Sequence, residues 1–216
     1  HAEDVVVPRE RDAGVERERL AAVHLAHQPH RHVAVVRKVH AVAAEAAQRA
    51  VDDLHHRPRH AALLQDTRSL DGVDPAAYDG VFLVGGQSPM VTYRGNEKLQ
   101  RLVVRFHEAG KVTALVCHAT CVLLEARLSS GDLLVKGKTW TGFATSEEAY
   151  ADSFVCKRIQ PFWIEEEARK LPGTNFVVDQ PFREFAVRDG RLITGQQQFS
   201  GAAAATRAIA IAADLR

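Results

Sequence analysis

After residue 70, two patterns of apolar residues follow each other along the chain: short continuous runs and the spacing of an amphipathic helix. Residues 78–86 and 112–117 are short apolar runs, and the first ends in two glycines. Such runs predict buried parallel strands, each followed by a turn. Between them, residues 97–109 predict an amphipathic helix that stops at Gly110. The apolar positions of that helix are Leu99, Leu102, Val103 and Phe106.

The alternation continues towards the C-terminus. Residues 185–194 give the clearest local signal, because two alternating runs flank Asp189-Gly190, a preferred pair for a tight hairpin turn. Ser200 is the expected N-cap of a last helix over 201–215. The other predicted elements are helices over 119–128 and 161–170 and short strands over 133–135, 138–143 and 176–178. Strands that alternate with helices predict an α/β fold, a mainly parallel sheet covered on both faces.

The first 70 residues do not share this pattern. Ala, Val, Arg and His dominate them, and every aromatic residue lies at Tyr78 or later. Residues 15–64 favour helix but offer few large apolar side chains for a core. The sequence therefore divides into an atypical region over 1–70 and a domain over 71–216.

Composition and charge exclude several partners. The 28 Lys+Arg and 27 Asp+Glu leave a net charge of +1, which argues against nucleic acid and against an anionic membrane surface. No apolar run reaches the ~18 residues of a membrane span. Three cysteines are too few for a disulfide scaffold, so we expect free thiols and a cytoplasmic location.

The histidines of the first region suggest a check for metal binding. His24, His27 and His30 have spacings that one helix face can hold. They lack a cysteine pattern or an acidic partner, and biased composition explains them better than a zinc site does. We expect no metal and no cofactor.

Cys117 is the first candidate for chemistry. It lies at the end of a predicted buried strand that leads directly into a helix, a position that presents a nucleophile and favours its anion. The alternative is a buried structural cysteine, the usual fate of a free thiol. Cys121 fits the core better, and Cys156 lies in a polar stretch.

Other polar groups could assist this thiol. His118 can act as its base only if the turn is irregular, since adjacent helical residues do not face each other. Glu147 and Glu148 could provide a carboxylate partner for His118, or form a capping pair in the first turn of a helix with Ser146 as the cap, and both roles can coexist. Gly85 and Gly86 follow a neighbouring strand and could offer backbone N–H groups as an oxyanion hole, or form a plain turn.

Four blocks together resemble the ThiJ/PfpI superfamily, in particular its glyoxalase III and heat-shock-chaperone-like branch. They are Val84-Gly-Gly86, Ala114-Leu-Val-Cys117-His118, Thr141-Gly-Phe143 and Asp189-Gly-Arg-Leu-Ile-Thr-Gly195-Gln196. The resemblance covers residues 72–210. It implies a flavodoxin-like three-layer sandwich that forms a homodimer.

The resemblance also implies roles for individual residues. Cys117 would be the nucleophile, His118 its partner and Glu148 the third member of the triad. Gly86 and the amide of His118 would bind the oxyanion. The N-terminal segment resembles the family only in part: Asp4 would stand where the family has a glutamate that contacts the cysteine, and the first strand is missing.

Two departures from the family pattern affect the pocket. Cys117-His118 is followed by Ala119-Thr120, whereas members commonly continue with Gly-Pro. Gly86 is followed by Gln87-Ser88, whereas members commonly have Gly-His-Gly. We therefore assign Gly85, Gly86 and Gln87 to substrate binding and leave the substrate's identity open.

The origin of residues 15–68 has two explanations. Their composition and the abrupt return of pattern near Leu70 suggest an out-of-frame reading of a GC-rich gene. The alternative is a genuine divergent helical insertion.

The sequence supports three functions. The first is glutathione-independent conversion of a small reactive carbonyl, a methylglyoxal-like 2-oxoaldehyde, to a 2-hydroxy acid, with Cys117 as nucleophile. The second is amidase- or peptidase-like acyl transfer at the same cysteine. The third is a stress holdase or thiol sensor that is not an enzyme.

Overall fold

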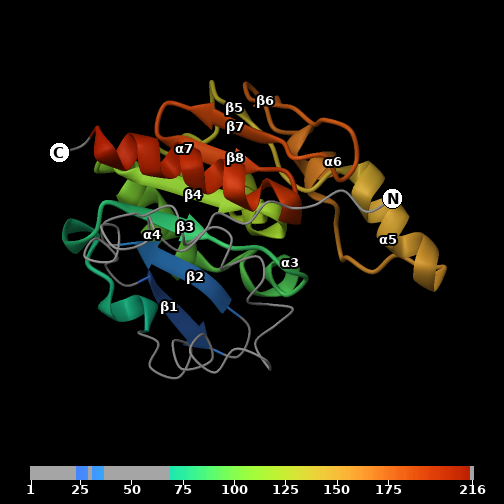
Figure 1. Ribbon diagram of the computed structural model, residues 1–216, viewed down its shortest axis with the longest axis horizontal. Helices are drawn as coiled ribbons and strands as arrows, with labels where there is room; N and C mark the ends of the chain where they lie inside the picture. The colour runs from blue at the N-terminus through green and yellow to red at the C-terminus, as the bar shows by residue number, and fades with distance from the viewer. Residues whose placement is uncertain (1–22, 29–30, 37–68, 215–216) are drawn as a thin grey trace, which may run out of the picture.

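The computed structural model describes residues 23–28, 31–36 and 69–214. A six-stranded sheet with the order β1-β2-β3-β4-β8-β7 forms the centre of this part of the chain (Figure 1). The strands are β1 (Val23–Gln28), β2 (Arg31–Val36), β3 (Gly80–Leu83), β4 (Val112–Val116), β7 (Ala186–Asp189) and β8 (Leu192–Gly195).

The sheet is parallel in its centre and antiparallel towards both edges. β3 and β4 run parallel, and β4 and β8 do too. The β1–β2, β2–β3 and β7–β8 pairs are antiparallel. The α/β class is therefore confirmed, and the parallel strands are those that lead to the candidate chemistry.

Helices cover the central strands. α4 (Glu97–Glu108) and α7 (Gly201–Ala213) both pack on β4, and α7 lies across β4 and β8 (Figure 1). All five residues of β4 are buried, so both faces of the strand are covered, as in a three-layer sandwich. The predicted helix over 97–109 is thus confirmed, with its apolar stripe in the core.

Shorter elements flank the central strands and helices. The 3₁₀ helix η4 (Cys117–Leu124) follows β4 at once, and α3 (Pro89–Thr92) packs against it. The others are α5 (Thr145–Val155), α6 (Ile164–Ala168), and a two-stranded parallel sheet of β5 (Thr139–Trp140) and β6 (Asn175–Phe176). The part of the chain that the structure describes also contains three single-turn 3₁₀ helices: η2 (Leu70–Gly72), η3 (Pro75–Ala77) and η5 (Gln198–Ser200).

The predicted hairpin is confirmed. β7 and β8 pair with Asp189 opposite Leu192, and Gly190 has a φ of +61°, a conformation that glycine adopts without a steric penalty. The turn thereby sets the register of β8, which carries the residues beyond Gly195 towards the end of β4.

The helix expectation for residues 15–64 is wrong over 23–28 and 31–36. These residues form β1 and β2, and β2 pairs with β3 from Val33 opposite Leu83 to Val36 opposite Gly80. The edge of β3 offers backbone groups that need hydrogen-bond partners, and β-branched valines suit a strand, so tertiary pairing overrides the local helix preference.

Several predicted boundaries and caps also differ. The helix expected over 119–128 is the 3₁₀ helix η4, and the strand expected over 133–135 is reduced to an isolated bridge at Leu133. Ser146 lies inside α5, and Ala144 occupies its N-cap. Ser200 stands at the N-cap of α7 but makes no cap bond; its hydroxyl accepts the N–H of Phe185 at 3.0 Å.

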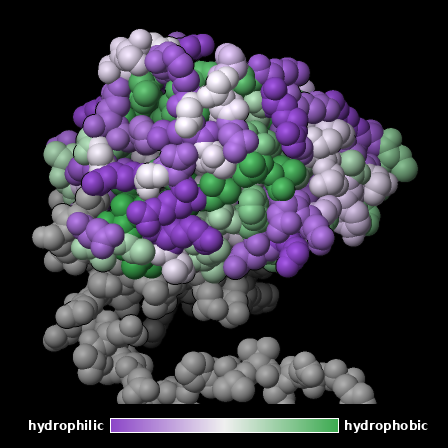
Figure 2. All heavy atoms as spheres, turned by 90° about the horizontal axis from the view of Figure 1, so that it is seen from above, coloured by the Kyte–Doolittle hydropathy of each residue, from purple (hydrophilic) through white to green (hydrophobic). Residues whose placement is uncertain are grey.

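The surface shown in Figure 2 is mostly polar, with an apolar area near the middle of that face. The largest exposed apolar side chains in the described part are Val91, Tyr150, Phe154, Val155, Ile159 and Phe199. Within the same residues, no helix combines the length and apolarity needed to cross a membrane.

Candidate active site

Cys117 stands at a sharp turn between β4 and η4. Its φ is +62°, in the left-handed region that residues other than glycine seldom adopt. The Thr120 hydroxyl donates a hydrogen bond of 2.7 Å to the Cys117 carbonyl and holds the turn closed. Backbone strain at a buried cysteine that follows a parallel strand is typical of a functional position.

The turn brings the His118 ring back onto the thiol of the preceding residue. His118 Nδ1 lies 3.6 Å from Cys117 Sγ, and His118 Nε2 lies 3.0 Å from Glu148 Oε1. Cys117 is 7% exposed, while His118 and Glu148 are almost fully buried. The irregular turn that such an arrangement needs is present, and the structure brings all three predicted residues together.

The two contacts of His118 favour its charged form. Burial by itself lowers the pKa of His118, but the Cys117 charge, the Cys117 hydrogen bond and the Glu148 carboxylate outweigh it and raise the pKa to about 10. At neutral pH the ring is then an imidazolium that donates one N–H towards the sulfur and the other to the carboxylate.

Phe143 supports the ring of His118 from its face. The two ring centroids are 4.1 Å apart and the planes differ by 25°, so the rings are stacked. The stack limits rotation of the imidazole and places an aromatic face against a cation. Sequence reasoning gave Phe143 no role, although the Thr141-Gly-Phe143 block pointed to the segment.

Gly85 lies directly against the cysteine. A Cβ on Gly85 would stand 2.6 Å from Cys117 Cβ and 2.8 Å from the Val116 carbonyl oxygen, so only glycine fits there. Gly86 has a φ of +111° and is exposed, and the Gln160 side-chain amide donates a hydrogen bond to the Gln87 Oε1. The oxyanion and substrate-binding roles of Gly85, Gly86 and Gln87 stay predictions.

The two adjacent glutamates of α5 have different partners. Glu148 contacts His118, whereas Glu147 accepts backbone N–H groups of Ala144 and Phe182 and the Gln196 side-chain amide. The sequence had placed both acids as partners of His118 or as a capping pair. Each has one of these roles, since Glu147 caps the helix start.

The other cysteines lie apart from this arrangement. Cys121 is fully buried, its thiol contacts the Pro89 carbonyl at 3.5 Å, and burial raises its pKa to about 12. It is therefore a core residue, as expected. Cys156 is exposed at the C-cap of α5.

Asp4 lies outside the described residues, so its expected contact with the thiol stays a prediction. His30, one of the histidines considered for metal binding, lies outside them too. Among the residues that the structure describes, no group of three or more His, Cys, Asp or Glu side chains is arranged to hold a metal ion.

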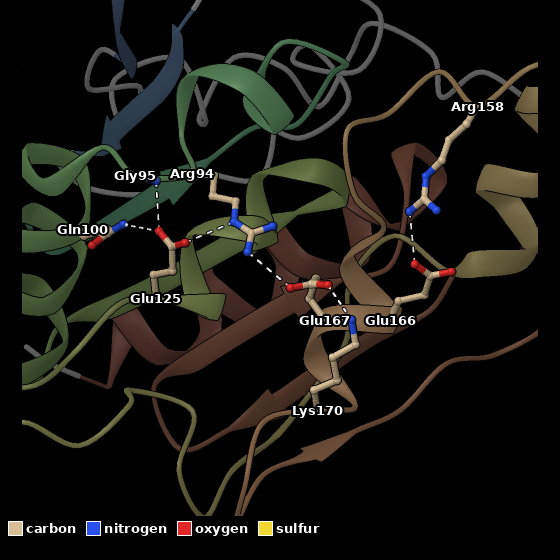
Figure 3. A network of polar contacts seen from close by, with 8 residues as sticks. All are labelled: Arg94, Gly95, Gln100, Glu125, Arg158, Glu166, Glu167 and Lys170. Carbon is tan, nitrogen blue, oxygen red and sulfur yellow. Dashed lines mark hydrogen bonds and ion pairs between the residues drawn. The ribbon is translucent and has the colours of Figure 1, made fainter.

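A polar network anchors the segments around the site. Arg94, at the end of α3, donates to Glu125 beyond η4 and to Glu167 of α6 (Figure 3). Glu125 also accepts the Gly95 N–H and the Gln100 amide. These contacts connect the far end of η4 to α6 and α4, which carry Glu167 and Gln100.

A model described as the DJ-1/PfpI family matches residues 33–209. The probable glutathione-independent glyoxalase hsp3103 of Schizosaccharomyces pombe is 28% identical over 153 residues, 69% of this chain and 59% of that protein. Glyoxalase 3 of Candida albicans is 28% identical over 134 residues, 61% of this chain and 57% of that protein. The chain thus spans just under three fifths of these relatives.

Solved structures show the same fold. The crystal structure of glyoxalase III from Candida albicans matches with a TM-score of 0.63 at 24% sequence identity. The match covers 76% of this chain and 68% of that chain. At this identity the likeness supports the sandwich architecture.

Proposed function

Because the chain belongs to the DJ-1/PfpI family, we propose that it is a cysteine-dependent glyoxalase. It converts methylglyoxal-like 2-oxoaldehydes to 2-hydroxy acids and needs no glutathione, metal or nucleotide. The observation that carries the proposal is the His118 bridge between Cys117 Sγ and the Glu148 carboxylate. The two relatives are named as a probable glutathione-independent glyoxalase and as glyoxalase 3, and these names support this choice of activity.

The chemistry starts with the Cys117 sulfur. The thiolate attacks the aldehyde carbon and forms a carbon–sulfur bond, while His118 supplies the proton that the new alkoxide takes up. The product is a hemithioacetal. The imidazolium beside the sulfur is suited to this step because it stabilises the thiolate before attack and carries the required proton.

Rearrangement and hydrolysis complete the reaction. A base removes the hydrogen on the former aldehyde carbon, and a proton is returned to the neighbouring carbonyl carbon. The first carbon is oxidised to a thioester and the second is reduced to an alcohol, so no external oxidant is needed. His118, Glu148 or Asp4 relays these protons, and water then cleaves the thioester to the 2-hydroxy acid and free Cys117.

The direct test measures loss of methylglyoxal without glutathione. The Cys117→Ala variant should fall to the rate of a protein-free blank. Cys156→Ala is the matched control, because it removes an exposed thiol that has no contact with His118 or Glu148, and it should keep the wild-type rate. Equal rates for Cys117→Ala and the wild type would overturn the proposal.

The same site could act on an amide or ester carbonyl, since acyl transfer uses the same thiolate and the same proton relay. A panel of fluorogenic peptides and amides, assayed beside methylglyoxal, separates the two reactions. Turnover of peptides that depends on Cys117, with no loss of methylglyoxal, would assign the site to acyl transfer.

A holdase activity is a third candidate, supported by the exposed rings of α5. Tyr150 and Phe154 are 54% and 71% exposed, and their ring centroids are 4.9 Å apart. Exposed aromatic surface can capture unfolded chains. A holdase would suppress aggregation of a heated client equally well in Cys117→Ala, and less well after Phe154→Ser.

We also propose that the protein forms a homodimer, as the family resemblance implies. Light scattering during gel filtration should give a mass of twice the 23.8 kDa chain. A mass of a single chain at micromolar concentration would contradict this proposal without affecting the proposed chemistry.

A further inference from the structure

Glu147 is a buried carboxylate that the proposed reaction does not use. It is adjacent to Glu148 in the first turn of α5, and both side chains are almost completely shielded from solvent. A buried carboxylate carries a large desolvation cost unless donors surround it. The contacts of Glu147 therefore have to account for its presence beside the site.

Three N–H donors from three segments surround this carboxylate. The Ala144 N–H donates to Oε2 at 3.0 Å, and the Phe182 N–H and the Gln196 side-chain amide donate to Oε1 at 2.9 Å each. Ala144 begins α5, Phe182 belongs to the segment before β7, and Gln196 follows β8. Glu147 thus joins the start of α5 to the central sheet.

Gln196 is itself held in one orientation. Its Oε1 accepts the Asp179 N–H at 2.8 Å, and its Nε2 donates to the Asp179 carbonyl oxygen at 3.4 Å. These two bonds to Asp179 set the orientation of the amide, and Nε2 makes its shorter bond, 2.9 Å, to Glu147. A carboxylate at position 196 would not donate to Glu147.

The sheet topology places the Glu147–Gln196 contact on the strand next to the one that leads to Cys117. β4 and β8 are parallel neighbours with Val116 opposite Gly195, so Cys117 and Gln196 are the first residues beyond two paired strand ends. His118 follows Cys117 and holds Glu148, while Gln196 holds Glu147. Consecutive residues of α5 are thus tied to consecutive strands of the sheet.

We propose that Glu147 and Gln196 form a positioning pair that fixes Glu148 against His118. With both glutamates attached, α5 can neither shift along its axis nor rotate about it without breaking a buried contact. The Glu148 carboxylate therefore stays within hydrogen-bond reach of His118 Nε2, and the ring stays within reach of the thiol. The inference deepens the proposed function, because it assigns a cause to the geometry on which that function rests.

The test uses the reactivity of Cys117 and not turnover, in a Cys156→Ala background that removes the exposed thiol. Gln196→Met removes the amide at similar length, and Glu147→Gln keeps the shape but replaces one acceptor by a donor. Both should lower the rate of Cys117 alkylation by iodoacetamide at pH 7 about tenfold, the factor for ~1.4 kcal/mol. The labelled thiol is quantified by mass spectrometry.

A second readout reports on the ring itself. Once Glu148 is loosened, the carboxylate supports the imidazolium less, so the His118 pKa measured by NMR should fall in both variants. Glu166→Gln is the matched control, because it removes a carboxylate whose partner is the exposed Arg158 (Figure 3). It should change neither the alkylation rate nor the His118 pKa.

The outcomes separate a positioning role from a merely structural one. Because the two residues act through one contact, the double variant should lose no more reactivity than the worse single variant. Folded variants with wild-type alkylation and an unchanged His118 pKa would overturn the inference, whatever their melting temperature. If Gln196→Met does not fold, Glu147→Gln decides alone.

The readouts also keep this inference separate from the proposed substrate. A wild-type protein that alkylates readily but leaves methylglyoxal intact would contradict the glyoxalase proposal only. A wild-type protein that consumes methylglyoxal, with unchanged Cys117 reactivity in both variants, would contradict the positioning pair only.

Discussion

At the scale of single residues, the site depends on the two contacts that the His118 side chain makes. The ring of His118 contacts the thiol of its own neighbour in sequence and a carboxylate thirty residues away. The contact with the thiol does not form in a regular helix, because adjacent side chains there point apart. The positive φ of Cys117 accompanies this contact, so the strain is part of the site.

The raised pKa of His118 predicts how stability depends on pH. The pKa is about 10 in the folded protein against an ordinary 6.5, so the charged ring contributes its full stabilisation below about pH 6.5. That contribution is lost as pH rises towards 10. Urea unfolding across this range should show the free energy of unfolding fall.

The Cys117→Ser variant is the control for this prediction. It removes the sulfur, and the Cys117 charge is the largest of the contributions that raise the pKa of His118. The His118 pKa measured by NMR should therefore fall in the variant. The loss of stability should still begin near pH 6.5, but it should be smaller and end at a lower pH than in the wild type. An unchanged pKa would show that the thiolate does not stabilise the ring.

Thr120 predicts a further effect at this scale. Its hydroxyl donates to the Cys117 carbonyl at 2.7 Å inside the protein. Thr120→Val keeps the shape and leaves that carbonyl without this donor, so the free energy of unfolding should fall by about 1 kcal/mol. Thr120→Ser keeps the hydroxyl and should restore most of it. Equal thermal melts for the two variants would contradict this account.

At the scale of elements, close packing joins η4 to the segment before α5. A Cβ on Gly142 would overlap the Thr120 hydroxyl oxygen and lie 3.2 Å from Ile164 Cγ2. Gly142 therefore lets the segment that carries Phe143 approach η4 and α6. The stack of Phe143 on His118 depends on that approach.

This packing predicts a rescue. Gly142→Ala should lower the free energy of unfolding by about 1–3 kcal/mol, the usual range for overpacking a core. Adding Thr120→Ala removes the overlapping hydroxyl and should recover part of the loss, beyond the effect of Thr120→Ala alone. Chemical unfolding of the single and double variants measures the coupling. Strict additivity would show that the overlap is relieved elsewhere.

At the scale of the whole molecule, β4 connects the core to the chemistry. Both of its faces are buried, and its last residue precedes Cys117. The strands on either side are β3 and β8. β3 leads to Gly85-Gly86 and β8 leads to Gly195-Gln196, and these residues lie at the same edge of the sheet. Core packing therefore sets the distances within the site.

The central position of β4 predicts a large effect of a core cavity. Leu115→Ala removes a fully buried side chain and should lower the free energy of unfolding by about 2–5 kcal/mol. Urea unfolding measures this directly. Because Leu115 does not touch the thiol contacts described, the activity that remains should follow the folded fraction measured by circular dichroism.

The origin of residues 15–68 is also a question for the whole molecule. The proposal of an altered reading frame predicts that a single-base change in the coding DNA restores an apolar strand and a glycine-rich loop. Sequencing that DNA decides the matter. If no such change exists, the segment is a genuine divergent part of the chain.

Local sequence patterns were enough to predict the periodic elements and the candidate triad. The apolar runs of β3 and β4, the stripe of α4 and the Asp189-Gly190 turn are local patterns, and a short window suffices to recognise them. Cys117, His118 and Glu148 followed from the strand end and from the family resemblance. Their roles remain the proposal that the alkylation and turnover experiments test.

The contacts between polar groups could be identified only from the folded chain. The pairing of β2 with β3, the division of labour between Glu147 and Glu148, and the stack of Phe143 on His118 join residues far apart in sequence. No local signal encodes such contacts, because burial and unsatisfied hydrogen-bonding groups select the partners after the strands have aligned. Motifs that are separate in the sequence thereby form one site, because they follow neighbouring strands of the sheet.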